Sequence, residues 1–313
     1  MKTKSLIKSF QRGLARNGLK ATCWLIDNIP SRISYVISHF LLAIGYVFIA
    51  RHKRIAGESM DIAFGNTKPE AEKKALIKKC FFDFGYGMFE LLYCLSHPQA
   101  IDKKISLEGL PYLEAALAKG KGVVAVTAHF GNFPLMMLYF ARKKYPISCI
   151  IRPTRDEDLT KLLHQKREQA GLKTIYAVPR IECVNQSLKA LRSNEILFIP
   201  VDQNFGSGSG VYVDFFGQKA ATATGPIVFA RRTEAVVLPM FIVHEGKDNH
   251  RIIIEAPINI EEKSDDRETL TFNMSTITRL VEQYVRKYPS EWAWMHRRWK
   301  SKPLSQNNEE EQE

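Results

Sequence analysis

The sequence lacks the signatures of several common enzyme and scaffold classes. No Gly-Lys-Ser/Thr follows the glycine-rich segment 206–210, which argues against a P-loop. The chain has neither a Gly-x-Ser-x-Gly elbow nor a His-Glu-x-x-His motif. The 5 cysteines have no Cys-x-x-Cys spacing, which indicates reduced thiols rather than a disulfide scaffold or a zinc cluster. No histidine spacing is typical of metal ligands, so we expect no metal site.

Acidic residues are in deficit, with 33 Asp and Glu against 45 Lys and Arg, and the net charge is +12. This balance predicts affinity for an anionic partner, whether nucleic acid, an anionic membrane face or an acidic protein. The 313 residues are 45% hydrophobic and 25% charged, as in globular proteins. That composition excludes collagen, a long coiled coil and wholesale disorder, and the length allows one large domain or two small ones.

The N-terminal residues predict attachment to a membrane. The longest apolar run, 34–50, would form a helix about 26 Å long at roughly 1.5 Å per residue, slightly short of a hydrocarbon core. We expect residues 33–54 to form a membrane-anchoring helix that spans the bilayer or lies in its interface; a buried core helix is the alternative. Residues 1–32 predict a basic amphipathic segment on anionic lipid. Its basic residues are Lys2, Lys4, Lys8, Arg12, Arg16 and Lys20.

Beyond residue 100, segments typical of strands alternate with segments typical of helices. Apolar runs predict strands at 122–128, 147–151, 174–178, 196–201, 236–243 and 251–254. Helical patterns fall between several of them, at 135–144, 158–171, 181–193 and 225–233. The alternation predicts an α/β fold with a mostly parallel central sheet and helices on both faces. Further helices are expected at 67–96 and 269–288, and an acidic, frayed tail at 304–313.

Polar residues follow several of the predicted strands, where reactive groups of parallel sheets gather. His129 lies between a strand and a helix that Asn132 caps and Pro134 begins, so a neutral imidazole there is available to take a proton from a hydroxyl. Asp202 and Arg152 each follow another strand, and neighbouring strand ends would bring Asp202 within reach of His129. The structural alternatives are a buried histidine, a turn residue and a surface charge.

Two further segments are candidates for binding anions. Thr224 begins a predicted helix, whose free amide groups suit an anion. Residues 292–300 interleave tryptophans with Arg297 and Arg298, a pattern typical of a phosphate or headgroup contact at a membrane interface. Stacking on nucleic acid is the alternative, but we expect no nucleic-acid partner because lipid explains the charge equally well.

Taken in order along residues 30–303, these features resemble the bacterial lipid A biosynthesis acyltransferases. The matching elements are the apolar N-terminal helix, Arg54, Asp61–Gly65, His129-x-x-Asn132, Asp202-Gln203, Phe215-Phe216-Gly217, Thr224-Gly225 and Trp294–Lys300. The resemblance implies a glycerolipid acyltransferase-like domain over residues 55–303. It also implies transfer of a fatty acyl group from a thioester, on acyl carrier protein or coenzyme A, to a hydroxyl of a membrane glycolipid such as a lipid A precursor.

The resemblance assigns roles to particular residues and a place to the protein. His129, Asp202 and Arg152 would be catalytic: the base, its orienting carboxylate, and a cation for the oxyanion or an acceptor phosphate. The residues expected to bind substrate are Asn132, Gln203, Phe216, Gly217, Thr224, Arg297 and Arg298. We expect a monomer without cofactors at the cytoplasmic side of a bacterial inner membrane, with the acceptor lipid, acyl carrier protein and the anionic membrane surface as partners.

The sequence departs from the family pattern at one position. The pattern is a histidine, four residues and then Asp or Glu, and here Pro134 stands where the acid belongs. Our interpretation is that Asp202 substitutes for it. The alternatives are a slow or inactive lipid-binding relative, and a lysophospholipid acyltransferase.

Overall fold

The computed structural model describes residues 31–154, 156–206, 210–246 and 248–303, with isolated residues between 13 and 29. The basic residues of the predicted N-terminal segment and the predicted acidic tail 304–313 lie outside the described residues.

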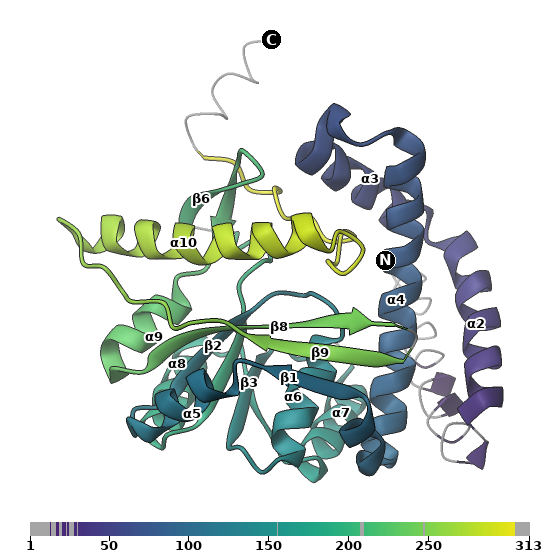
Figure 1. Ribbon diagram of the computed structural model, residues 1–313, viewed down its shortest axis with the longest axis horizontal. Coiled ribbons are helices and arrows are strands. Elements are labelled where there is room, and N and C mark those ends of the chain that lie inside the picture. The colour runs from purple at the N-terminus through teal and green to yellow at the C-terminus, as the bar shows by residue number, and fades with distance from the viewer. Residues whose placement is uncertain are drawn as a thin grey trace, which may run out of the picture.

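In the described part of the chain, the centre is a seven-stranded sheet (Figure 1). Its strands are β1 (Ile105–Glu108), β2 (Val123–Thr127), β3 (Ile147–Ile151), β4 (Leu172–Tyr176), β5 (Ile196–Pro200), β8 (Val236–Glu245) and β9 (Asn249–Ile254). Their order is β1-β9-β8-β2-β5-β3-β4, and every neighbouring pair is parallel except β8 and β9. The predicted mostly parallel α/β sheet is therefore confirmed. The sequence did not predict β1, a four-residue strand that is only half buried.

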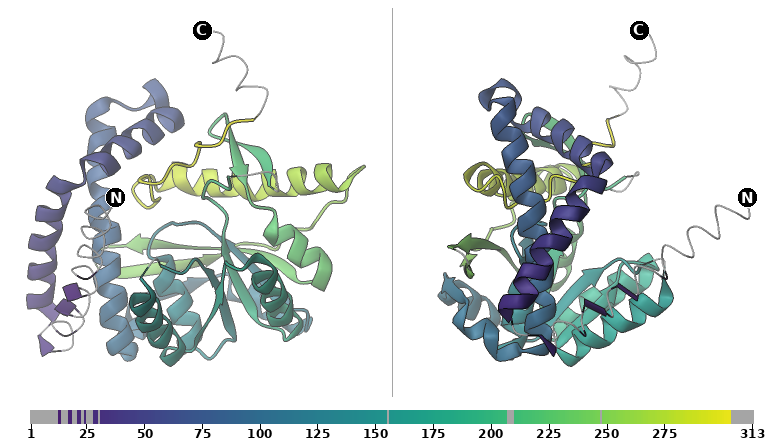
Figure 2. Two further views of the ribbon diagram at one scale, coloured as in Figure 1. Left: turned by 180° about the vertical axis from the view of Figure 1, so that it is seen from behind. Right: turned by 90° about the vertical axis from the view of Figure 1, so that its right-hand side faces the viewer.

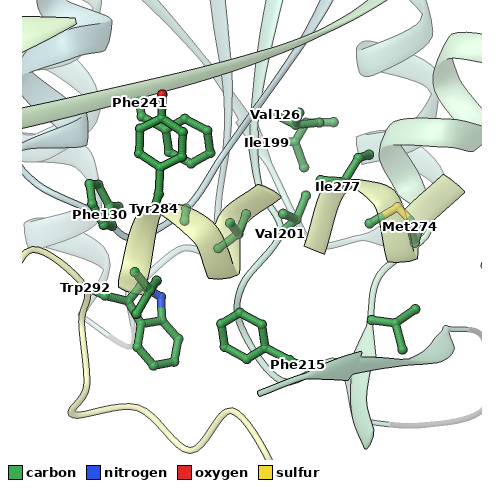
Figure 3. Packing of buried hydrophobic residues seen from close by; sticks show 14 of the residues in the cluster. Val126, Phe130, Ile199, Val201, Phe215, Phe241, Met274, Ile277, Tyr284 and Trp292 are labelled. Atoms are coloured by element: carbon green, nitrogen blue, oxygen red, sulfur yellow. The ribbon is translucent and has the colours of Figure 1, made fainter. Parts of the chain in front are cut away.

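Helices cover both faces of the sheet. They are α5 (Leu110–Ala118), α6 (Phe133–Arg142), α7 (Glu157–Gln169), α8 (Arg180–Arg192), α9 (Gly225–Thr233) and α10 (Asp266–Lys287). Side chains of β2 alternate between two cores: Val124 and Val126 pack with residues of α8, α9 and α10, whereas Val123 and Ala125 pack with those of α5 and α6. Figure 3 shows the first core, where Val126 of the sheet faces Ile277 of α10. Burial on both faces explains the continuous apolar run of β2.

A hairpin that the sequence did not predict lies beyond α10. Its strands β6 (Val211–Phe215) and β7 (Gln218–Thr222) pair antiparallel and separately from the main sheet. The two residues between them, Phe216 and Gly217, both have positive φ, at 55° and 74°. This is the backbone of a two-residue type I′ turn, whose twist matches that of paired strands. The hairpin packs on α10 (Figure 1).

In the described residues from 31 onward, three helices precede the sheet: α2 (Ser31–Phe48), α3 (Ala50–Phe64) and α4 (Glu70–Ser96), with the short turns η1 (Gly65–Thr67) and η2 (Pro98–Lys103) after α3 and α4. The expected single helix over 33–54 is wrong, because the chain breaks between α2 and α3. Among the described residues no single helix is long and apolar enough to cross a bilayer; Tyr35–Phe48 and Ala50–Thr67 meet that test only together, and they bend by 78°. Instead, α2 lies along α4 (Figure 2).

The contact between α2 and α4 depends on Gly85 of α4. A Cβ at this position would clash with Cδ2 of Leu42 in α2, whereas a Cβ at Gly57 of α3 would meet nothing within 4 Å. Glycine therefore permits the close approach of the two helices at this point.

We expect Gly57→Ala to raise the free energy of unfolding by about 0.5–1 kcal/mol, because alanine favours helix. Gly85→Ala should show no such gain, since the new methyl group displaces Leu42. Adding Leu42→Ala to Gly85→Ala should recover part of it. Chemical denaturation in detergent measures all three variants, and equal gains for Gly57→Ala and Gly85→Ala would contradict the close packing.

Candidate active site

His129 and Asp202 meet because they follow neighbouring strands that end at the same level. In the parallel pair of β2 and β5, Thr127 lies opposite Pro200, and the amide of Val201 donates to the Thr127 carbonyl at 3.0 Å. His129 and Asp202 each lie two residues beyond that last pair. His129 Nδ1 lies 2.9 Å from Asp202 Oδ1. The expected convergence of these two strand ends is present in the structure.

The Asp202 carboxylate is fully enclosed, with a side chain 0% exposed. Its second oxygen accepts a hydrogen bond from Trp292 Nε1 at 2.8 Å, and its backbone carbonyl lies 3.2 Å from His296 Nε2. Burial alone raises the pKa of Asp202, but the charge and hydrogen bond of His129 outweigh it and hold the pKa well below its usual range. Asp202 is therefore a permanent carboxylate beside the imidazole.

The His129 ring is oriented by Asp202 and open on its other side, with its side chain 26% exposed. Because Asp202 is ionised, Nδ1 carries the proton and donates it, which leaves a lone pair on Nε2. Burial lowers the pKa of His129, but the charge and hydrogen bond of Asp202 outweigh it, so the pKa is raised above its usual value. The exposed Gln203 caps this lone pair, with Nε2 of its amide 3.0 Å from His129 Nε2.

The backbone of residues 129–131 is fixed by the segment that follows α10. Ala293 N donates to His129 O at 3.0 Å, Gly131 N donates to Glu291 O at 2.8 Å, and Phe130 forms a bridge with Trp292. Gly131 has a φ of 53°, and a Cβ there would clash with the carbonyl of Ile242 in β8. Only glycine fits this turn.

The Asn132 side chain is buried and hydrogen bonded within the protein. It is 5% exposed, and its Oδ1 accepts from Leu135 N as the predicted cap of α6. Its amide donates to Gly87 O and Glu90 Oε2 of α4, each at 3.1 Å. With both polar atoms engaged inside the protein, Asn132 does not offer them to a substrate.

Arg152 is not brought to His129. It is exposed after β3, and β5 lies between β3 and β2. Two strand spacings amount to about 10 Å. Neither His129 nor Asp202 makes a hydrogen bond or ion pair with Arg152 in the described part of the chain. The structure thus pairs the base with the carboxylate, and the role of the Arg152 guanidinium stays a prediction.

A search of the described residues finds no group of three or more His, Cys, Asp or Glu side chains arranged to hold a metal ion. The polar centre of the site is the His129–Asp202 pair itself. Such a pair suits proton transfer to and from an acyl acceptor, since a carboxylate stabilises the imidazolium that forms when Nε2 takes a proton.

The chain, taken over most of its length, is similar to proteins of one known family. A model of the bacterial lipid A biosynthesis acyltransferases matches residues 18–301. The chain belongs to this family and is an acyltransferase. It is 23% identical to the lipid A biosynthesis lauroyltransferase of Escherichia coli K12, over 90% of this chain and 89% of that protein. It is 21% identical to the lipid A biosynthesis palmitoleoyltransferase of the same bacterium, over 91% and 90% of the two chains.

The resemblance drawn from the sequence motifs is thus confirmed. Among solved structures, the 1-acyl-sn-glycerophosphate acyltransferase PlsC from Thermotoga maritima aligns with 79% of this chain and 97% of its own. That alignment has 16% identity and a TM-score of 0.37. The family assignment follows from the family model and the sequence relatives.

The C-terminal segment of the acyltransferase corrects our interpretation of residues 292–300 as a headgroup contact. Trp292 and Trp294 are fully buried. Arg298 is also buried, and its guanidinium donates to Gln203 O at 3.2 Å, to Ala221 O and to Thr222 Oγ1. Burial lowers the pKa of Arg298 to about 10, and Asp202 partly offsets this. Arg298 therefore joins the loop after β5 to the hairpin by hydrogen bonds inside the protein. The prediction that Arg298 binds substrate is wrong, because its side chain is buried.

The remaining predicted binding residues lie on separate elements. Phe216 and Gly217 form the hairpin turn, and the Phe216 ring is buried against Phe64 of α3 with Arg286 above it. Thr224 is the N-cap residue of α9, without a side-chain capping bond. Arg297 is exposed. Of the predicted binding residues, all of which the structure describes, Gln203 is the one whose side chain hydrogen bonds to the His129 side chain.

Sequence reasoning missed the groups that complete the site, above all Trp292 and His296. Both lie in residues 292–300, for which the sequence predicted a headgroup contact. The available signal was the two-residue spacing of Trp292 and Trp294, which is as typical of a buried strand-like segment as of a membrane contact. Nothing in the local sequence marks Trp292 as the donor to a residue 90 positions earlier.

The two adjacent arginines allow a matched test of burial. Arg298→Ala should lower the free energy of unfolding by about 3–5 kcal/mol, because two buried acceptors, Ala221 O and Thr222 Oγ1, and the part-buried Gln203 O lose a charged donor. Arg297→Ala should change it by no more than about 0.5 kcal/mol. Chemical denaturation measures the free energy of unfolding of both variants. Similar losses for the two would show that the buried hydrogen bonds of Arg298 do not stabilise the protein.

Proposed function

We propose that the protein is a membrane-associated O-acyltransferase that moves a fatty acyl group from a thioester to a hydroxyl of a bacterial glycolipid. The observation that carries the proposal is His129, with Nδ1 held by an ionised, buried Asp202 and with Nε2 in contact with the amide of the exposed Gln203. The family supplies the reaction class, and the names of the relatives favour a lipid A precursor as the acceptor.

In this mechanism His129 Nε2 takes the proton of the acceptor hydroxyl while the hydroxyl oxygen attacks the thioester carbonyl. Asp202 stabilises the imidazolium that forms. The carbon–sulfur bond then breaks, and His129 returns the proton to the departing sulfur. Gln203 occupies the place that the hydroxyl needs beside Nε2, so its exposed side chain must move aside when the acceptor binds.

Asp202 supplies the carboxylate that Pro134 does not. Pro134 lies in the first turn of α6, where a proline ring suits the helix but offers no side-chain oxygen. The carboxylate comes instead from the end of β5, fully buried and hydrogen bonded on both oxygens. This arrangement favours an active enzyme over an inactive lipid-binding relative. We assign to the exposed Arg152 contact with an acceptor phosphate rather than with the reacting carbonyl.

Membrane association is supported by an uncovered apolar face on α2. Its large apolar residues are 43–80% exposed: Ile33, Tyr35, Val36, Phe40, Leu41, Ile44, Val47 and Phe48. The start of α3 adds a basic cluster of Arg51, His52, Lys53 and Arg54. An apolar helix beside a basic cluster is typical of binding in the interface of anionic lipid. We place the enzyme at the cytoplasmic side of a bacterial inner membrane, where acyl carrier protein, an acidic donor, would complement the net charge of +12.

Purified protein tests the chemistry with acyl-carrier-protein and coenzyme A thioesters against glycolipid and lysophospholipid acceptors, with mass spectrometry of the products. His129→Ala should lower kcat/KM by about 10³-fold or more, since it removes the base. Full activity of this variant would contradict the mechanism. A fully folded wild type that binds glycolipid but yields no product with any donor would identify a lipid-binding relative instead.

The pH dependence of the reaction rate tests whether Asp202 sets the pKa of His129. The wild-type rate should rise as the pH passes upward through the raised pKa of His129, because only the neutral ring accepts a proton. Asp202→Asn should lower the rate by about 10³-fold and move this acid limb to lower pH, since burial then acts on His129 without the compensating charge. The exposed Asp214→Asn is the control. A near-normal rate and limb for Asp202→Asn would remove Asp202 from the mechanism.

Vesicle binding tests the α2 face. Phe40→Glu together with Val47→Glu should weaken sedimentation with anionic phospholipid vesicles by about tenfold or more, because two charges then face the acyl region. Ile181→Glu on α8, which replaces another exposed apolar residue, should leave binding unchanged. Equal binding by all variants would show that α2 is not the membrane contact.

A further inference from the structure

The turn that carries His129 is held from outside by α4. The amide of Asn132 reaches two groups of that helix, the Gly87 carbonyl and the Glu90 carboxylate, each at 3.1 Å. The approach is close, because a Cβ at Gly87 would lie only 3.3 Å from Asn132 Cγ. Since Asn132 also caps α6, one side chain joins α4, α6 and the turn of His129.

Glu90 is the charged end of this contact and is itself tightly fixed. Its side chain is 15% exposed; Oε1 accepts from Lys104 Nζ, and Oε2 lies against His250 Nε2, each at 2.7 Å. Burial raises the pKa of Glu90, but His250 and Lys104 outweigh it and lower the pKa to about 2. An ionised acceptor makes a stronger hydrogen bond to an amide than a neutral one does. Asn132 is thus held by a permanent charge.

Apart from the His129 side chain, which contacts Asp202 and Gln203, the other described residues of the turn have main-chain hydrogen bonds as their anchors. His129, Phe130 and Gly131 are tied by backbone contacts, and Pro134 adds no side-chain hydrogen bond in the first turn of α6. The contact of Asn132 with Glu90 is therefore the side-chain tie that fixes where α6 begins. The position of α6 in turn fixes the His129 ring, which lies against Phe133 at a centroid distance of 5.0 Å.

We propose that Glu90 is a positioning residue for the acyl-transfer reaction, which acts through Asn132 to hold His129 in register with Asp202. Glu90 touches neither the base nor its carboxylate, so its effect is geometric. A displacement of about 1 Å at a reacting group costs on the order of 10²-fold in rate. The proposal rests on the function assigned to His129 above.

Glu90→Gln tests the geometry with a nearly isosteric change. We expect kcat to fall by about 10- to 100-fold with KM within about twofold of the wild-type value. The acid limb of the pH profile should not move, because Asp202, and not Glu90, sets the pKa of His129. Glu108→Gln, at an exposed acid of β1, is the matched control and should behave as wild type.

Exchanging the amide at position 132 with the carboxylate at position 90 tests whether Glu90 positions His129 or only stabilises the fold. Asn132→Asp keeps the cap oxygen but sets two carboxylates against each other, so it should lose activity alone. Combined with Glu90→Gln, the introduced amide at position 90 can donate to the introduced carboxylate at position 132. The double variant should recover at least about tenfold in kcat over Asn132→Asp, although the bond to Gly87 O is not restored.

The outcomes are distinct from those that test the function itself. Wild-type kcat for Glu90→Gln, a shifted acid limb, or a double variant no better than Asn132→Asp would overturn the positioning role while His129→Ala remains inactive. If Glu90→Gln does not fold, as seen by circular dichroism, the comparison of the double variant with Asn132→Asp decides alone. Full activity of His129→Ala would instead defeat the proposed function.

Discussion

The hydrogen bond between His129 and Asp202 is the interaction on which the rest of the site depends. A carboxylate with no exposed surface is costly unless its oxygens are paired, and here His129 and Trp292 take one oxygen each. The same pairing keeps Asp202 ionised and directs the lone pair of His129 outward. One contact therefore stabilises a buried charge and orients the imidazole that the proposed mechanism uses as the base.

The C-terminal segment completes this site from inside the protein. Trp292 donates to Asp202, and Arg298 holds the carbonyl of Gln203 together with the hairpin. Their aromatic and basic character is used for packing and internal hydrogen bonds. Part of the net positive charge, that of Arg298, is thus buried inside the protein. The net charge therefore overstates the positive charge available to an anionic partner.

The sequence predicted what local patterns determine. The continuous apolar run of β2 and the Asn132 cap of α6 depend on neighbours within a few residues, and both are present. The proximity of Asp202 to His129 followed from a general rule about parallel strands. The strand order was not predictable, so the sequence did not show that β5 separates β3, which Arg152 follows, from β2. The burial of Trp292 depends on partners far along the chain, among them Cys80 and Asp202, which no local pattern records.

A carboxylate at the end of β5 changes what the catalytic pair requires of the fold. An acid at position 134 would keep its distance from His129 through the local geometry of one helix turn. Asp202 instead depends on the register of β2 against β5, and a slip of one residue would turn its side chain to the opposite face of the sheet. The bond from Val201 N to Thr127 O fixes that register at the last possible point. In the proposed mechanism, residues that hold the strand ends and the turn in place therefore contribute to catalysis without touching a substrate.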